Sequence, residues 1–280
     1  MSFFLKKPVN CKFINMPYLA CFPRDHIGKE IIRHGFYEHK CLELLFGKAL
    51  AKHKDTLKNK TALDVGANIG NHSCYFAPLF KNVISFEPNP LPRHLLEANK
   101  IANGFEHIHI EPVGLGEKDE ELEFFPFGNK NIGKGSFDAE QVKQEENFKE
   151  PVTLPIVRGD DLLKEKYPDA NIGFIKLDIE GFEYFALKGL ENTIKKHKPF
   201  IVFESNKTQG DHAGYAIKSY LESFGYQNFY AITRTQIKPR IAEKIKKSIF
   251  GKTFRLKEIN TLEEKEYPMV LATCDPLTCA

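Results

Sequence analysis

The sequence lacks several features that mark particular classes of protein. It contains no tryptophan, its formal net charge is only +3, and no stripe of basic residues is interleaved with aromatic ones. These absences argue against a nucleic-acid partner. No apolar run approaches the roughly 20 residues that span a bilayer, and the start "MSFFLKKPVN" lacks the apolar core and cleavage site of a signal peptide. We therefore expect a cytoplasmic protein.

Cysteine pairs are also missing. None of the 6 cysteines forms a C-x-x-C motif; they are Cys11, Cys21, Cys41, Cys74, Cys274 and Cys279. Zinc ligation by cysteine is therefore not expected, and a disulfide scaffold is improbable at this length. Scattered reduced thiols agree with a cytoplasmic location.

The chain does contain the alternation of elements that is typical of an α/β fold. Its 280 residues are 42% hydrophobic, which is enough for one large domain. Short runs that are apolar on both faces predict buried parallel strands; they are "TALDV", "NVISFEP", "HIHIEPVGLG", "IGFIKLDIEG" and "KPFIVFES". Helix-like stretches lie between or after them, namely "PLPRHLLEANKIAN", "FEYFALKGLENTIKKHK" and "HAGYAIKSYLESFGY". This order predicts a doubly wound sheet.

Three regions depart from that rhythm. Residues 1–60 are predicted to form an N-terminal cap within the same unit as the main domain, residues 61–280. Residues 126–150 are polar and predict a long loop beside a hairpin. Residues 236–256 form a lysine-rich insertion with isoleucine at every fourth position. We expect a helix that packs these isoleucines on the domain; the alternative is contact of 237–250 with a membrane surface or a lipid-linked glycan.

The stretch "DVGANIG" (64–70) follows a predicted strand and precedes a predicted helix. Backbone N–H groups point outward at such a loop, and glycine lets a ligand approach. A dinucleotide fingerprint that starts at Gly66 needs glycine at 68 and 71, where this chain has Asn68 and Asn71. The spacing therefore disfavours a nicotinamide-dependent oxidoreductase, which stays as an alternative.

Two carboxylates indicate a different cofactor. Asp64 stands before the loop, where its charge repels a pyrophosphate but suits a cationic ligand. Glu87 ends the next strand, where an acid can accept both ribose hydroxyls of an adenosine. An adenosine with a positive end and no phosphate is S-adenosylmethionine. A non-catalytic adenosine-binding module remains a further alternative.

Several stretches together resemble the FkbM family of S-adenosylmethionine-dependent methyltransferases. They are "GFYE" (35–38), "LDVGANIGNHS" (63–73), "FEPNP" (86–90), Asn103, "VGLGEKDEELEFF" (113–125) and, most specifically, "IKLDIEGFEYFALKGL" (175–190). The resemblance implies a Rossmann-like sheet of seven mostly parallel strands with helices on both faces. The last strand, 267–273, is expected to be antiparallel. "VRGDDLL" (157–163) and the 236–256 insertion depart from the family pattern.

The resemblance also implies a cofactor pocket. Its methionine and ribose side is expected to be lined by Asp64, Gly66, Asn68 and Gly70. Glu87 is expected to hold the ribose. Val113 and Gly114 are expected to lie against the adenine.

Catalysis is expected at the carboxyl ends of the fourth and fifth predicted strands. Asp178 and Glu180 end one of these strands, and Glu204 ends the other. Ligands of open α/β sheets bind at this edge, and residues 178 and 180 share a face if the strand extends that far. We favour Glu180 or Asp178 as the base that deprotonates a hydroxyl; a divalent cation held by these oxygens is the less favoured alternative.

Other polar residues have a functional and a structural interpretation. His72 and His212 could each serve as the base or contact the substrate, since histidine titrates near neutral pH. Glu38 could cover the methionine end of the cofactor. Glu183 opens a helix, and there we expect capping rather than chemistry.

The sequence therefore predicts an O-methyltransferase that uses S-adenosylmethionine. The resemblance implies sugars, glycan ends or secondary metabolites as acceptors, and a bacterial saccharide is preferred. Fold alone does not identify the acceptor.

Overall fold

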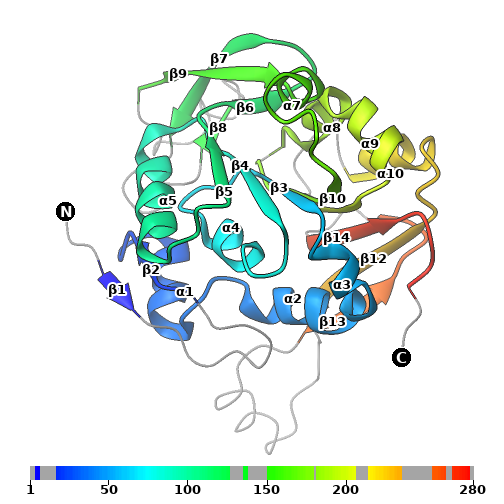
Figure 1. Ribbon diagram of the computed structural model, residues 1–280, viewed down its shortest axis with the longest axis horizontal. Helices are drawn as coiled ribbons and strands as arrows, with labels where there is room; N and C mark the ends of the chain where they lie inside the picture. Colours follow the sequence, from blue (N-terminus) through cyan, green and yellow to red (C-terminus); the bar gives the residue numbers. More distant parts are fainter. Residues whose placement is uncertain are drawn as a thin grey trace, which may run out of the picture.

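A sheet of eight strands forms the centre of the fold, in the order β13-β12-β14-β11-β10-β3-β4-β5 (Figure 1). These strands are β3 (Thr61–Val65), β4 (Asn82–Phe86), β5 (Ile108–Glu111), β10 (Ile172–Leu177), β11 (Phe200–Ser205), β12 (Asn228–Arg234), β13 (Phe254–Glu258) and β14 (Tyr267–Thr273). The computed structural model describes residues 4–6, 17–126, 135–137, 150–179, 181–205, 214–234, 254–262 and 267–277.

The strand directions confirm the predicted Rossmann-like sheet. Strands β11, β10, β3, β4 and β5 are parallel neighbours, and β14 lies antiparallel between β11 and β12. The predicted last strand, 267–273, is therefore correct in place and direction. Strand β13 pairs with β12 and makes the sheet one strand wider than the seven expected. Its first residues belong to the predicted insertion, whose remainder, 236–253, lies outside the described residues.

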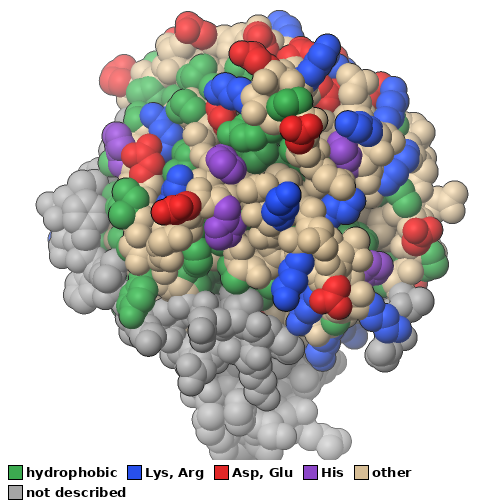
Figure 2. Space-filling model, in the orientation of Figure 1, with side chains coloured by type: hydrophobic (Ala, Val, Ile, Leu, Met, Phe, Trp, Pro, Cys, Tyr) green, Lys and Arg blue, Asp and Glu red, His purple; other side chains and the backbone are tan. Residues whose placement is uncertain are grey.

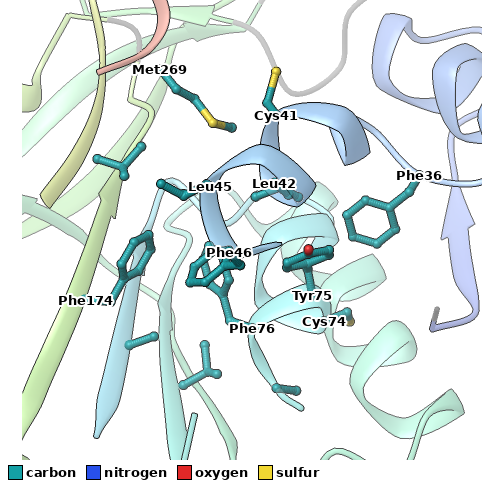
Figure 3. Packing of buried hydrophobic residues seen from close by; sticks show 14 of the residues in the cluster. Phe36, Cys41, Leu42, Leu45, Phe46, Cys74, Tyr75, Phe76, Phe174 and Met269 are labelled. Atoms are coloured by element: carbon teal, nitrogen blue, oxygen red, sulfur yellow. The ribbon is translucent and has the colours of Figure 1, made fainter. Parts of the chain in front are cut away.

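Alternate side chains of the strands enter two separate hydrophobic cores. On one face, Phe174 of β10 lies 5.2 Å, between ring centroids, from both Phe46 and Phe76 (Figure 3). On the other face, Ile175 packs with Leu187 and Ile194. Figure 1 shows the two helical layers, with α1 to α3 on one side of the sheet and α7 to α10 on the other. Because both faces of β10 are covered, apolar residues occur on both of its faces.

The helices that the sequence predicted lie at the expected places, but their lengths differ from the predicted ones. The predicted helix at 90–103 is α5 (Pro90–Ala102), which begins at an Asn89 side chain that accepts a hydrogen bond from the Leu91 N–H. The other helices after β3 in the described ranges are α4 (Asn71–Phe76), α7 (Gly159–Lys166), α8 (Glu183–Gly189), α9 (Glu191–His197) and α10 (Gly214–Glu222). The single helix predicted over 182–198 is thus two helices, because the backbone leaves the helical conformation at Leu190.

The predicted strand "HIHIEPVGLG" is also divided. Pro112 has no N–H for a sheet ladder, and the chain leaves the central sheet there. Its second half, β6 (Gly114–Gly116), joins a smaller sheet of order β6-β9-β7-β8. The other members are β7 (Glu120–Pro126), β8 (Gly135–Ser136) and β9 (Val152–Arg158). The antiparallel pair β7 and β9 flanks the predicted long loop 126–150, of which 127–134 and 138–149 lie outside the described residues.

The N-terminal segment covers the Phe174 face of the sheet. It consists of β1 (Phe4–Lys6), β2 (Leu19–Cys21), α1 (His26–His34), α2 (His39–Leu44), a π-helical turn (Leu45–Ala49), a 3₁₀ turn (Ala51–His53) and α3 (Lys54–Leu57). Basic and acidic side chains are interspersed over the described surface seen in Figure 2. Within the ranges that the structure describes, we find no helix with both the length and the apolar character needed to cross a membrane.

Asparagine side chains of α4 and α5, and one at the end of α5, attach this segment to the rest of the fold. The Asn99 amide accepts a hydrogen bond from the Ala20 N–H (2.6 Å) and donates to the Ala20 and Ile69 carbonyls (3.1 and 2.8 Å). One turn later, Asn103 exchanges the same pair of bonds with Tyr18 (2.7 and 2.8 Å). Asn71 does so with Tyr37 (3.2 Å each). These amides imitate the pairing of a neighbouring strand.

We expect Asn99→Ala to lower the free energy of unfolding by about 3 kcal/mol, because Asn99 is fully buried and its loss leaves main-chain groups without partners. Urea unfolding followed by circular dichroism measures the change. Asn103→Ala is the matched control: it removes the same pattern of bonds at a partly exposed position, and we expect a loss of about 1 kcal/mol. Equal losses in both variants contradict this account.

Candidate active site

The topology places a cavity of about 300 Å³ at the carboxyl ends of the parallel strands. The order of strands reverses between β3 and β10, and ligands of open α/β sheets bind at such a reversal. Of the predicted site residues, the cavity is lined by Gly66, Asn68, Glu87, Asp178, Glu204, Glu38 and His72. Aromatic and aliphatic side chains of the smaller sheet and its surroundings close one end, namely Phe124, Phe137 and Leu154.

The loop after β3 passes very close to the chain after β10. Gly66 has φ +80°, and a Cβ built on it would lie 2.1 Å from the Asp178 carbonyl oxygen. Its N–H and that of Ala67 donate to the Phe86 carbonyl at 3.1 and 3.0 Å. Only glycine satisfies both the left-handed conformation and the close approach. The loop is thereby fixed between the ends of β4 and β10.

Glu87, at the end of β4, is oriented by this loop. One carboxylate oxygen accepts the Asn68 N–H at 2.8 Å and the other accepts the Asn89 N–H at 2.9 Å. Burial raises the pKa of Glu87 to about 7, although the two N–H donors act in the opposite direction. An ionised carboxylate offers about four acceptor sites, so roughly two remain for a ligand. This arrangement suits a pair of hydroxyls.

A row of polar side chains crosses the strands beneath the cavity. Asp64 of β3 is fully buried, and its Oδ2 accepts a hydrogen bond from Ser73 at 2.5 Å. The Ser85 hydroxyl in turn donates to Ser73 at 2.8 Å. On the other side, the Lys176 ammonium lies 3.7 Å from Asp64 Oδ1 and 3.1 Å from Asp178 Oδ2. One buried cation therefore serves two carboxylates.

Asp178 is the member of this row that reaches the cavity. Burial raises its pKa, but the charge of Lys176 and the hydrogen bond that Lys176 donates act in the opposite direction, and the pKa of Asp178 is held below its usual range. Its carboxylate also accepts a hydrogen bond from the carboxyl group of Glu204 of β11, which lowers its pKa further. The pKa of Lys176 is raised to about 12, because attraction to Asp178 and Asp64 exceeds the effect of burial. Asp178 is therefore an ionised carboxylate with a fixed position.

The N-terminal segment forms the opposite wall. Glu38 has φ 57°, an uncommon conformation for this residue, and its Oε2 lies 3.3 Å from His72 Nε2. The His72 side chain is only 7% exposed, and Nε2 has no hydrogen-bond partner. Burial, followed by nearby carboxylates, raises the pKa of Tyr37 beyond its usual range. These residues form a polar wall that faces Asp178 and Glu204.

Several predicted residues do not line this cavity. Asp64 lies one layer beneath the cavity, where it contacts Lys176, which in turn contacts Asp178. Gly70 starts α4 with φ +80°, beside Leu96. Val113 packs against the second hydrophobic core, and a Cβ built on Gly114 would lie 2.6 Å from Ile156 and 3.5 Å from Pro88, of which only Pro88 lines the cavity. Glu180 and His212 lie outside the described residues, so their roles stay predictions.

Glu183 has the structural role expected for it. Its two carboxylate oxygens accept the N–H groups of Ile179 and Gly181 at 2.9 and 3.0 Å. The residue is 1% exposed, and burial raises its pKa to about 7. This side chain shapes the turn between β10 and α8.

Two important residues were not predicted. Lys176 lies within the stretch "IKLDIEGFEYFALKGL", and a lysine in the otherwise apolar run "IGFIKLDI" is the signal that could have identified it. Asn71 was noted only as the absence of glycine, yet it attaches Tyr37 to the cavity. Among the described residues, no group of three or more His, Cys, Asp or Glu side chains is arranged to hold a metal ion.

Comparison with known proteins identifies relatives of this chain. Residues 64–227 match the methyltransferase FkbM domain. The hexuronic acid methyltransferase AglP of Haloferax volcanii is 29% identical over 142 residues, which are 50% of this chain and 54% of that protein. Methyltransferase 1 of Beauveria bassiana is 25% identical over 178 residues, 59% of this chain and 71% of that protein. The chain thus spans about half the length of the first of these relatives.

Among solved structures, methyltransferase FkbM from Methylobacillus flagellatus KT aligns with a TM-score of 0.45 and 18% identity. The alignment covers 77% of this chain and 44% of that chain.

Proposed function

Because this chain belongs to the FkbM methyltransferase family, we propose that it transfers a methyl group from S-adenosylmethionine to a hydroxyl of a sugar or glycan, preferably a bacterial saccharide. The main support for this cofactor is the geometry of Glu87. Two N–H groups orient its carboxylate, which keeps acceptor sites for a ligand in the cavity. The cavity has no Lys or Arg among its described lining residues, which disfavours a ligand with a pyrophosphate. When bound, S-adenosylmethionine supplies an electrophilic methyl group on a sulfonium.

The residues present fit this cofactor. Glu87 holds the ribose hydroxyls, and the loop at Gly66 and Asn68 supports the chain that leads to the sulfur. Phe124 and Leu154 provide an apolar surface for the adenine, whereas the family resemblance implied Val113 and Gly114 in that role. Asp178 and Glu204 lie at the opposite end of the row of strand ends.

His72 is the best placed residue to accept the proton of the acceptor hydroxyl. The sequence favoured Asp178 or Glu180 as the base, but Lys176 keeps Asp178 ionised and so makes it a weak proton acceptor. The Nε2 of His72 has no hydrogen-bond partner and lies 3.3 Å from Glu38. A proton taken up by the imidazole is then stabilised by the Glu38 carboxylate.

The sugar acceptor is supported by one relative and by the chemistry of the wall. The Haloferax protein is named for methylation of a hexuronic acid. Glu38, Tyr37 and His72 offer hydrogen-bonding groups around the acceptor end of the cavity, as a polyhydroxylated ligand requires.

Calorimetry with S-adenosylhomocysteine and with NAD, titrated separately, tests the cofactor. We expect saturable heat with S-adenosylhomocysteine and none with NAD, since the loop lacks the dinucleotide spacing. Radiolabelled S-adenosylmethionine with a panel of glycosides then tests the acceptor. Binding of NAD alone would remove the proposal, and label transferred only to non-sugar hydroxyls would remove its acceptor half.

A further inference from the structure

Lys176 and Asp178 form an ion pair whose two ends lie in different environments. The side chain of Lys176 is 4% exposed, whereas that of Asp178 is 34% exposed and lines the cavity. Their charged atoms are 3.1 Å apart. The carboxylate is thus presented to the cavity while its counter-ion stays behind it.

The charges of this group do not cancel. Lys176 also lies 3.7 Å from Asp64, which is fully buried. Two carboxylates and one ammonium leave one negative charge in excess. Because Asp64 and Lys176 are closed off from the cavity, a ligand meets this excess at Asp178. In a site largely closed to water, such a charge acts strongly on a neighbouring cation.

The order of the strands determines what lies next to Asp178. The row of strand ends runs from Glu87 after β4, across Gly66 after β3, to Asp178 after β10. Gly66 and Asp178 are in close contact, as the 2.1 Å separation of an added Cβ from the Asp178 carbonyl indicates. Suppose that Glu87 holds the ribose of a ligand and that the ligand extends across Gly66. The group attached beyond the ribose then lies next to Asp178. In S-adenosylmethionine that group carries the positive charge.

We propose that Asp178 selects the cationic cofactor over its neutral product by charge, and that Lys176 is the positioning residue that holds this carboxylate ionised and in place. The inference rests on the proposed function, since it concerns the same cavity. After methyl transfer the sulfur is neutral, so the attraction to Asp178 ends and the product is released more readily. The same carboxylate thus favours both loading and turnover.

The test compares three ligands with known charge at the sulfur position. They are S-adenosylmethionine, its neutral product S-adenosylhomocysteine, and sinefungin, which carries an amine in place of the methylsulfonium. Calorimetry at pH 7.5 gives the Kd of each for the wild type, for Asp178→Asn and for Asp161→Asn. Asp161 is the control, because it is 66% exposed on α7 and does not line the cavity.

In the wild type and in Asp161→Asn we expect both cationic ligands to bind about tenfold more tightly than S-adenosylhomocysteine. In Asp178→Asn we expect this preference to fall to about one, while the affinity for S-adenosylhomocysteine stays within about threefold. That retained affinity also shows that the variant is folded. An unchanged preference in Asp178→Asn, or none in the wild type, overturns the inference and leaves the proposed function standing. If no adenosine ligand binds the wild type, both fall together.

Discussion

Glu87→Gln is expected to weaken the binding of S-adenosylhomocysteine by about 100-fold. A hydrogen bond to a charged group contributes about 1.5 kcal/mol or more, so two ribose bonds account for about 3 kcal/mol. In the wild type, the N–H groups of Asn68 and Asn89 both donate to the Glu87 carboxylate. The NH₂ group of a glutamine at this position would face one of these donors. Calorimetry measures the change.

The control for this variant is Glu111→Gln. Glu111 ends the next strand, β5, and is equally buried, but it binds Lys166 and Tyr167 at 2.6 and 2.7 Å and does not line the cavity. We expect its affinity for S-adenosylhomocysteine to stay within about threefold of the wild type. Similar losses in both variants, or none at Glu87, would place the ribose elsewhere.

The affinity of the wild type is also expected to depend on pH. Ribose hydroxyls donate to the ionised form of Glu87, whose pKa is about 7. Affinity therefore rises between pH 6 and pH 8, by up to about tenfold, and the dependence disappears in Glu87→Gln.

The contribution of Glu87 to the folding stability of the free protein has the opposite pH dependence. Because the pKa is raised from 4.5 to about 7, the stability contributed by Glu87 is present below pH 4.5 and is lost as the pH rises through 7.

Lys176→Met is expected to lower the free energy of unfolding by about 4 kcal/mol at pH 8. The substitution leaves Asp64, which is fully buried, and Asp178 without their shared cation, and an uncompensated buried charge costs about 3–5 kcal/mol. The loss is expected to shrink as the pH falls, because protonation relieves the repulsion. This agrees with the lowered pKa of Asp178 in the wild type, whose stabilising contribution is lost at low pH.

Lys118→Met provides the matched control for urea unfolding. Lys118 also lies 3.1 Å from a carboxylate, that of Glu120, but it is 72% exposed. A surface pair of this kind contributes less than about 1 kcal/mol. If the two lysine variants lose the same stability, or if the loss at Lys176 does not depend on pH, the row of polar residues is not the electrostatic unit described above.

Much of the central sheet could be predicted because its strands are buried on both faces. The runs that became β3, β4, β10 and β11 carry apolar residues on both faces, which is typical of parallel strands that are covered on both sides. The division of 108–116 into two strands could be predicted only in part. Pro112 indicated a break, but the second sheet that receives β6 is held by pairing with β9, far along the chain. Such pairing leaves no local signal.

The cavity residues could be predicted where topology alone positions them. Glu87, Asp178 and Glu204 lie at strand ends, and parallel strands bring their ends to one edge. Asp64 shows the limit of this reasoning. One residue of register decides whether a side chain enters the cavity or lies beneath it, and here Asp64 pairs with Ser85 and Lys176 across the strands. The ion pair with Lys176 depends on that register and was not predicted.

Of the N-terminal wall, Glu38 was expected near the cofactor, but Tyr37 was not, because its place depends on contacts between distant segments. The Asn71 amide holds the main chain of Tyr37, which lines the cavity beside Glu38. A single asparagine after a loop has many ordinary roles, so its sequence position does not reveal this contact.

The attachment of the N-terminal segment through asparagine side chains has a consequence for how the protein can change. The three amides bind only main-chain groups, at Tyr18, Ala20 and Tyr37. Main-chain groups are the same for nearly every residue type, so substitutions in this segment leave its anchorage intact.

This segment nevertheless supplies one wall of the cavity, and the region that matches the family, 64–227, begins only after it. The two halves of the cavity can therefore vary independently in evolution. Substitutions before residue 64 can change one wall of the cavity while the residues at the strand ends stay the same.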